Sequence, residues 1–384
     1  MRKLIFVLGL SLLALIVSGC NLFKKEQKAP KEPLLRQTGQ NAVESFSSEE
    51  HVDADVWVVT TRNAEKNSDS TFSFSTKVSP ELTMLAVNSQ TSQNSIWSER
   101  DDNAYQRLAQ YMAAKRNVQN CIMYIHGYGA DITKLIDQSR KIGLLYQSRV
   151  IALDWPTYQQ WFENETDSTY ARYWESRKNA IDSSMVFGRF LKAFFQQYPE
   201  TGCASITLLA QGQGNILVQS LVEKELFDSD MVYFDSIVLN AADVKRYQHR
   251  KWVSRLLIKN MEKSRIFVVF NEKDKVLNRA EDVLRSNDDY ESEDINRLGN
   301  IFKKHGLALN AFYLDVSNMK PIHEGFLEPG QSADGGLSCL GKMYLSILHA
   351  QIPEYSKETM KLIKKEKTAS EVWGYELRKN CKDA

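Results

Sequence analysis

Residues 203–218 read CASITLLAQGQGNILV, and this stretch decides the fold that the sequence predicts. Its first half is an apolar run around a β-branched threonine at 206–209, as in a central strand of a parallel sheet. The turn AQGQG follows at 210–214. Apolar residues then return at helical spacing from Asn215 to Val222. The stretch therefore predicts a buried strand, a sharp turn and the start of a helix.

A strand, a small-x-nucleophile-x-small turn and a helix make the nucleophile elbow of α/β-hydrolases, which holds the attacking residue in strained backbone. Ala210 and Gly214 occupy the two small positions, but the nucleophile position is Gly212. Glycine adopts such backbone at little steric cost and has no side chain that can attack. The turn alone leaves two interpretations open. One is a hydrolase scaffold released from catalysis, and the other is an ordinary glycine-containing turn.

Composition limits the class of protein. The chain has 384 residues, is 43% hydrophobic and 25% charged, and carries a formal net charge of +1. This fits one large α/β domain with additions. A net charge near zero argues against nucleic acid as a main partner. We also expect no metal and no cofactor. The cysteines and histidines form no ligand cluster, and the GQG of the turn lacks the third glycine of a dinucleotide-binding motif, where Leu217 stands.

Residues 1–20 have the pattern of an export signal. A basic start is followed by an apolar core at 4–17, which is too short for a comfortable membrane span. The ending VSGC resembles the lipobox of bacterial lipoproteins, which implies that Cys20 becomes lipidated and anchors the protein to a bilayer. An uncleaved N-terminal anchor is the alternative. The next residue is Asn21, not Asp, so in a host with two membranes the resemblance implies the outer membrane, facing the periplasm.

Four sections follow from the composition along the chain. After the signal at 1–20, residues 21–50 are polar and predict a flexible tether. Residues 51–349 form the α/β domain. Residues 350–384 are a charged extension, which we expect to be a solvated helix.

Strand and helix patterns alternate through the α/β domain. Alternation of this kind predicts a mostly parallel central sheet with helices on both faces. The expected strands are 52–61, 82–87, 121–127, 149–154, 203–209, 233–239, 265–270 and 309–316. The expected helices are 98–115, 132–146, 170–198, 215–222, 252–261 and 337–349, with a variable stretch at 274–305.

Cysteine placement suggests a disulfide framework in an exported protein. Cys121 and Cys203 stand at the starts of strands that neighbour one another in this fold, so they could pair. Cys339 and Cys381 would then tie the tail to the last helix. Four cysteines allow three pairings, and the sequence leaves the connectivity open.

Two loops after predicted strands are candidates for the site. His126-Gly127-Tyr128-Gly129 follows a buried strand at the place where α/β-hydrolases supply part of the oxyanion hole through backbone N–H groups. The backbone N–H groups of Tyr128 and Gln213 are the expected donors. Trp155, between Asp154 and a proline, either packs in the core or lines a cleft, and core packing is the commoner role.

The remaining candidates are an acid and a histidine. Asp274 ends the second strand after the elbow, where a triad acid belongs, and Asp243 is the second candidate. Either aspartate could instead cap a helix. His323 follows the last strand and is the natural triad histidine, whereas His249 and His305 lie in polar segments and are expected at the surface. The order 212, 274, 323 is nucleophile, acid, histidine, as this fold uses it.

These motifs together resemble a family of uncharacterised bacterial α/β-hydrolases, many of them exported. The family shows a TNR-like segment, HGYN, WPS, AHSMGN at the elbow and RLG before the last strand. The matching segments here are TRN at 61–63, HGYG at 126–129, WPT at 155–157, AQGQGN at 210–215 and RLG at 297–299. The departures gather at the elbow, where family His, Ser and Met are Gln211, Gly212 and Gln213.

Two functional hypotheses follow. A serine hydrolase needs a nucleophile polarised by a histidine that an acid orients, and Gly212 cannot supply it. The first hypothesis is an envelope-anchored pseudo-hydrolase that binds a small molecule or a protein partner. The second is an active, esterase-like hydrolase in which His323, oriented by Asp274, activates water as a general base.

Overall fold

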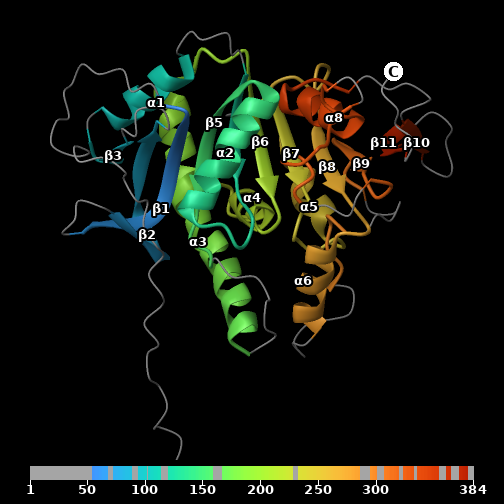
Figure 1. The fold of residues 1–384 in the computed structure, drawn as a ribbon, viewed down its shortest axis with the longest axis horizontal. Coiled ribbons are helices and arrows are strands. Elements are labelled where there is room, and N and C mark those ends of the chain that lie inside the picture. Colours follow the sequence, from blue (N-terminus) through green and yellow to red (C-terminus); the bar gives the residue numbers. More distant parts are fainter. Residues whose placement is uncertain are drawn as a thin grey trace, which may run out of the picture. The chain divides into compact units, whose positions relative to one another are not determined.

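One sheet organises the described part of the chain in the computed structural model (Figure 1). The structure describes residues 54–67, 72–88, 94–101, 103–113, 120–158, 167–227, 232–285, 295–300, 307–319, 323–332, 335–353, 360–364 and 372–378. The strands are β1 (Val56–Lys66), β2 (Phe72–Val87), β3 (Asn94–Ser98), β4 (Asn120–Ile125), β5 (Ser148–Asp154), β6 (Ser205–Gln211), β7 (Ser236–Asn240), β8 (Ile266–Phe270), β9 (Ala311–Asp315), β10 (Met360–Lys364) and β11 (Val372–Leu377). The helices are α1 (Ala104–Ala113), α2 (Ile132–Tyr146), α3 (Asp167–Gln197), α4 (Gly214–Glu223), α5 (His249–Val253), α6 (Lys275–Arg285) and α8 (Cys339–Leu348).

Most neighbouring strands of the sheet are parallel. The strand order is β10-β11-β9-β8-β7-β6-β4-β5-β1-β2-β3. Every pair from β1 through β5, β4, β6, β7, β8 and β9 to β11 is parallel, and antiparallel pairing is confined to the outer strands β2, β3 and β10. Strands β5 and β6 are buried at every position, as continuous apolar runs in a parallel sheet should be. The predicted α/β-hydrolase fold is confirmed.

Helices cover both faces of the sheet, because its side chains alternate between two apolar clusters. Met123 and Leu208 point into the cluster that also holds the buried sides of α3 and α4. Tyr124 and Leu209, the next residues along each strand, point into the cluster that holds α2 and α8. Figure 1 shows these helices on the two sides of the sheet.

The order of the strands reverses beside the elbow. From β4 the chain passes through α2 to β5 on one side and then returns through the long helix α3 to β6 on the other side. Strands β4 and β6 pair in parallel, with Ile125 opposite Ala210. Their carboxyl ends therefore lie side by side, at the switch point where open α/β sheets bind ligands. The loop that starts at His126 and the turn at Gly212 meet there.

Several predicted boundaries are confirmed, and one predicted helix is wrong. The helix over 132–146 has the predicted ends, whereas the helix expected over 252–261 stops at Val253. Beyond Val253, backbone groups of this segment form hydrogen bonds with other parts of the chain and not with the next turn of a helix. Asn310 Nδ2 donates to the carbonyls of Val253 and Leu256, and the Lys259 N–H donates to the carbonyl of Phe234. The stretch expected to be variable contains α6, which buries one apolar side.

The charged extension is not a solvated helix, which corrects the prediction for residues 350–384. It contributes β10 and β11, and β11 pairs in parallel with β9, so the sheet continues past the expected domain end at 349. Gly374 permits this pairing, because a Cβ there would collide with the backbone carbonyl of Tyr313. The Tyr375 ring lies 5.2 Å from that of Phe312. The prediction of a helix followed from the many lysines of this segment. Its aromatic and β-branched residues, which favour strands, indicate the observed structure better.

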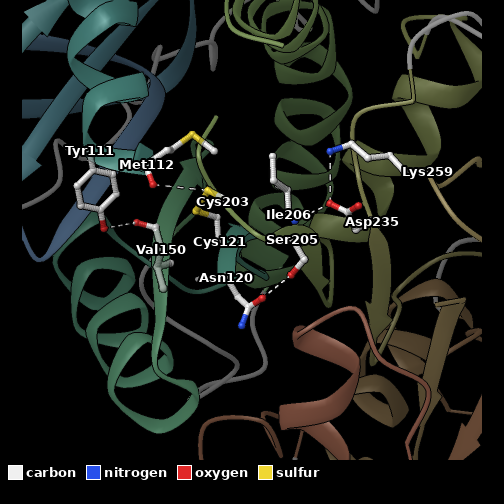
Figure 2. Close-up of a disulfide and its surroundings, with 10 residues drawn as sticks. All are labelled: Tyr111, Met112, Asn120, Cys121, Val150, Cys203, Ser205, Ile206, Asp235 and Lys259. Carbon is white, nitrogen blue, oxygen red and sulfur yellow. Dashed lines mark hydrogen bonds and ion pairs between the residues drawn. A yellow bond between two sulfur atoms is a disulfide. The ribbon is translucent and has the colours of Figure 1, made fainter. Parts of the chain in front are cut away.

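A disulfide joins the amino ends of two central strands (Figure 2). Cys121 of β4 and Cys203, just before β6, are bonded with their Cα atoms 5.8 Å apart, which confirms the expected pair. Cys339 is also disulfide-bonded. Its expected partner, Cys381, lies outside the described residues, and so do Cys20, the signal and the tether.

We expect the Cys121→Ala/Cys203→Ala double variant to lose about 3–4 kcal/mol of unfolding free energy, because the bond closes a loop of 82 residues and restricts the unfolded chain. Guanidinium denaturation under non-reducing conditions measures the loss. Peptide mapping of the wild-type protein checks that the two cysteines are linked. An unchanged midpoint in the double variant would contradict the expectation.

Candidate functional site

The elbow holds Gly212 in the left-handed region, at φ +54°. Its N–H donates to the carbonyl of Asn240 at 3.1 Å, and its own carbonyl accepts from the Asp243 N–H at 3.1 Å and from Asn215 Nδ2 at 3.0 Å. Partners on β7 and α4 thus fix the turn from both sides. Glycine is the residue that adopts this backbone at the lowest steric cost.

Asp274 and His323 are in contact. His323 Nδ1 donates to Asp274 Oδ2 at 2.7 Å. The other carboxylate oxygen, Oδ1, accepts from the N–H groups of Val276 at 2.9 Å and Leu277 at 3.1 Å, and so caps α6. The two roles that the sequence left open for this aspartate are both present, one on each oxygen. The structure therefore brings together the expected acid and the expected histidine.

The second nitrogen of His323 faces the elbow. A Cβ at position 212 would lie 3.2 Å from His323 Nε2 and 3.5 Å from the Cα of Gly127. A nucleophile on that Cβ would be within reach of the imidazole. His323 therefore lies between Asp274 and position 212, and position 212 carries no side chain.

The acid changes the protonation of this histidine. Burial lowers the pKa of His323, but the charge and hydrogen bond of Asp274, together with the charges of Glu324 and Asp243, outweigh burial and raise the pKa above its ordinary value. The loop around the histidine is anchored as well. Asn240 Nδ2 donates to the His323 carbonyl at 3.3 Å, and the Tyr344 hydroxyl donates to Asn240 Oδ1 at 2.7 Å.

Asp243, the second candidate acid, has other partners. It accepts from the Tyr173 hydroxyl at 2.8 Å through Oδ2, and its Oδ1 lies 3.6 Å from Arg177 and 3.8 Å from Arg297. Arg297, from the RLG segment, is completely buried. This aspartate binds arginines from two other parts of the chain, and its backbone N–H holds the elbow.

A buried ionic cluster supports the loop beside the elbow. Asp154 binds Arg62 Nε at 2.9 Å and lies 3.0 Å from His126 Nε2, and all three side chains have no exposed surface. His126 also stacks on Trp155, with ring centroids 5.2 Å apart. Arg62 Nη2 also donates a hydrogen bond to the carbonyl of Trp155 at 3.0 Å. Three separate motif segments therefore meet in one cluster, and the expectation that Trp155 packs in the core is confirmed.

Sequence reasoning missed this cluster. The signal was present, because Arg62 directly follows the strand-forming run VWVVTT at 56–61, and a buried arginine needs an acid. Burial raises the pKa of Asp154, but the charge of Arg62 and the hydrogen bond from His126 outweigh it and hold the pKa below its ordinary value.

The expected oxyanion donors lie on the two segments that border Gly212. Gln213 precedes α4 as its N-cap residue, with φ −66° and ψ −19°. Tyr128 follows Gly127, whose Cα is a near neighbour of the missing Cβ. Their role in stabilising an oxyanion stays a prediction.

His249 is not at the surface, which corrects the prediction. It is 1% exposed, its Nδ1 donates to the carbonyl of Arg246, and its Nε2 accepts from the Tyr313 hydroxyl at 2.7 Å. Burial lowers its pKa to about 4. The polar residues next to His249 in the sequence led to the prediction of an exposed position, but they do not share its buried environment. His305 lies outside the described residues.

Two further findings concern only the described ranges. They contain no group of three or more His, Cys, Asp or Glu side chains placed to hold a metal ion. None of their helices is long and apolar enough to cross a membrane.

We expect Arg62→Met to cost about 3–5 kcal/mol at neutral pH, because it leaves the Asp154 carboxylate buried without its main partner. The lowered pKa of Asp154 gives stability above the unfolded pKa of about 3.9, and the wild type loses it as the pH falls through the folded pKa. In the variant the carboxyl protonates at a higher pH, so the gap between the two proteins should narrow on acidification.

Urea denaturation of both proteins between about pH 7 and about pH 4 measures this difference. Arg100→Met is the matched control, because Arg100 makes an exposed ion pair with Glu81 and should change stability little. Equal losses for the two arginine variants would show that the buried ion pair does not stabilise the fold.

The fold agrees with the comparison by family. A family model described as "Alpha/beta hydrolase of unknown function (DUF900)" matches residues 100–327, which is more than half of the chain and includes Gly212, Asp274 and His323. No curated protein matches the chain. The chain therefore belongs to this family of α/β-hydrolases of unknown function.

Proposed function

We propose that this chain is an envelope-anchored pseudo-hydrolase that binds a ligand or partner at the site of a lost catalytic centre. The observation that carries the proposal is the contact geometry at Gly212. The histidine is oriented by Asp274 and faces the elbow, yet the elbow offers it no hydroxyl or thiol. Acyl-enzyme chemistry needs that group, so it cannot proceed at this residue.

Retention of the acid and the histidine does not require activity. Asp274 caps α6 through one oxygen, so its loss would free two backbone N–H groups. His323 gives that buried carboxylate its side-chain partner. Both residues therefore have structural reasons to remain after the nucleophile is lost. The presence of this pair is therefore not in itself evidence of catalysis.

An active hydrolase is the second candidate, and one observation favours it. His323 Nε2 faces a residue without a side chain, so a water molecule could be deprotonated there in place of a serine. The raised pKa makes the imidazole a stronger base but leaves less of it neutral at a given pH. The backbone N–H groups of Tyr128 and Gln213 would stabilise the resulting oxyanion.

The anchoring belongs to the same proposal and rests on the lipobox-like sequence that ends at Cys20. Lipidation at this cysteine would hold the protein on a bilayer, and in a host with two membranes the outer membrane, facing the periplasm, is the proposed place. Stable anchoring by lipid needs more than one acyl chain, which a lipidated N-terminal cysteine can carry.

The decisive experiment compares the purified full chain with its Gly212→Ser variant in an assay with short-chain p-nitrophenyl esters and a serine-reactive probe. We expect the wild type to be silent and the variant to label and to turn over ester. Its rate should rise with pH through the raised pKa of His323, because only the neutral imidazole accepts the serine proton. The variant should lose about 1–2 kcal/mol of stability, because serine at φ +54° is strained and crowds the imidazole.

Two controls sharpen the comparison. Gly335→Ser places a serine at another positive φ, +84°, with open space around it, and should gain nothing. His323→Ala in the Gly212→Ser background should abolish the gain. Turnover by the wild type that disappears in His323→Ala would favour the water mechanism. Silence of the serine variant would show that the acid and histidine are not placed for catalysis, against the proposal of a preserved site.

For the anchor, we expect the full chain expressed in a bacterial host to incorporate a labelled palmitate analogue, and Cys20→Ser to lose the label and leave the membrane fraction. The thiol is the group that receives the lipid, and serine cannot replace it. In-gel detection of the label, with cell fractionation, measures both results. A label that persists in Cys20→Ser would contradict lipidation at this residue.

A further inference from the structure

Two buried glutamines flank Gly212 with unused hydrogen-bonding groups. Gln211 is 2% exposed and Gln213 is 1% exposed. Within the described part of the chain, Gln213 Nε2, Gln213 Oε1 and Gln211 Nε2 have no hydrogen-bond partner. Buried side-chain amides are normally satisfied, because an unpaired one loses its contacts with water and gains nothing in return. Three such atoms lie on the two residues that flank Gly212.

The Gln211 amide lies beside Gly127. Gln211 is the last residue of β6. Its carboxamide lies against Gly127, because a Cβ on Gly127 would collide with the amide oxygen of Gln211. The Cα of Gly127 is also 3.5 Å from the position of a Cβ at residue 212. Gly127 therefore makes room for the Gln211 amide and also lies against the position of a Cβ at residue 212.

Gln213 stands at the other side, before the first turn of α4. It is the N-cap residue of this ten-residue helix, but its side chain makes no capping bond. The backbone N–H groups of a first helical turn favour an anion. The unpaired amide and the helix terminus thus lie on the same residue, directly after Gly212.

Most of these groups donate hydrogen bonds. His323 Nε2 faces Gly212. The charge of Asp274 raises the pKa of His323 and so favours the imidazolium form, in which Nε2 donates. The amide nitrogens of Gln211 and Gln213 and the N-terminus of α4 add further donors. Several donors on neighbouring residues suit a planar group with two acceptor oxygens, since each carboxylate oxygen can accept two hydrogen bonds.

The charges that face His323 are already engaged. Asp274 binds the imidazole itself. Glu324 accepts from Gln138 Nε2 at 3.1 Å, and Asp243 is paired with the two arginines described above. A bound anion would therefore meet the imidazolium and not a free carboxylate.

We propose that Gln211, Gln213 and His323 bind the carboxylate of a small organic acid beside Gly212. This inference rests on the proposed function. If the site forms no acyl-enzyme, a bound organic acid is a ligand there and not the product of a reaction. It also gives the two glutamines, which replace the family His and Met, a shared role in binding. The alkyl part of the acid would extend away from the elbow.

The test is isothermal titration of the full chain with butanoate, and with butanamide as a neutral ligand of the same shape. We expect butanoate to bind at least about tenfold more tightly, because only the anion gains from the imidazolium and the helix terminus. Binding should strengthen as the pH falls through the pKa of His323. The His323→Gln variant should lose this pH dependence.

Gln213→Met is the informative variant, with Gln219→Met on the same helix as its control, since the Gln219 amide is bonded to Glu223 at the surface. Gln213→Met should weaken butanoate binding about tenfold or more. It should also raise the melting temperature of the ligand-free protein by about 2–4 °C, because a methionine of similar size removes an unpaired buried amide. The control should change neither quantity.

The outcomes separate this inference from the proposed function. Butanoate binding no tighter than butanamide binding, no binding at all, or equal effects of the two glutamine variants would each overturn the carboxylate site. The pseudo-hydrolase proposal would survive those results as long as the wild type stays silent toward esters. Wild-type ester turnover would overturn the pseudo-hydrolase proposal instead, even if butanoate then binds as a product.

Discussion

The ion pair between Arg62 and Asp154 is the constraint on which the rest of this structure depends. Both side chains are completely buried, so neither charge would be tolerated without the other. The pair joins β1 to the end of β5, and His126 extends it to the end of β4. The ends of β4 and β5 at the carboxyl edge are thereby joined to β1. The loop that carries Gly127 starts from this fixed point, and its backbone forms one wall of the candidate site.

Across the switch point, the elbow is fixed by hydrogen bonds that do not require a nucleophile. The backbone of Gly212 is bonded to β7 and α4, and the carboxylate of Asp274 divides its oxygens between capping α6 and orienting His323. The geometry around Gly212 therefore does not depend on a side chain at that position. The family assignment gives the fold its context, while the proposed binding role rests on what this particular chain places around its glycine.

Local patterns predicted what local forces decide. Apolar runs and helical periodicity located the strands and helices of the central sheet, and the chain order of Gly212, Asp274 and His323 predicted their meeting at one edge. Predictions failed where contacts distant in sequence override local preference. His249 lies among polar residues but is buried against Tyr313, and β11 adds to the sheet because Gly374 can approach β9 closely. Composition alone reports neither contact.

The sequence by itself determined the fold class, the absence of a nucleophile at the elbow and the identity of the acid and histidine candidates, because these depend on residue type and order along one chain. Only the tertiary structure decided that Asp274, and not Asp243, meets His323, that Arg62 and Asp154 form a buried pair, and that the amides of Gln211 and Gln213 have no partner. Hydrogen bonding and burial depend on distances between segments far apart in the chain. Those distances are set by the packing of the sheet and its helices, which no single stretch of sequence contains.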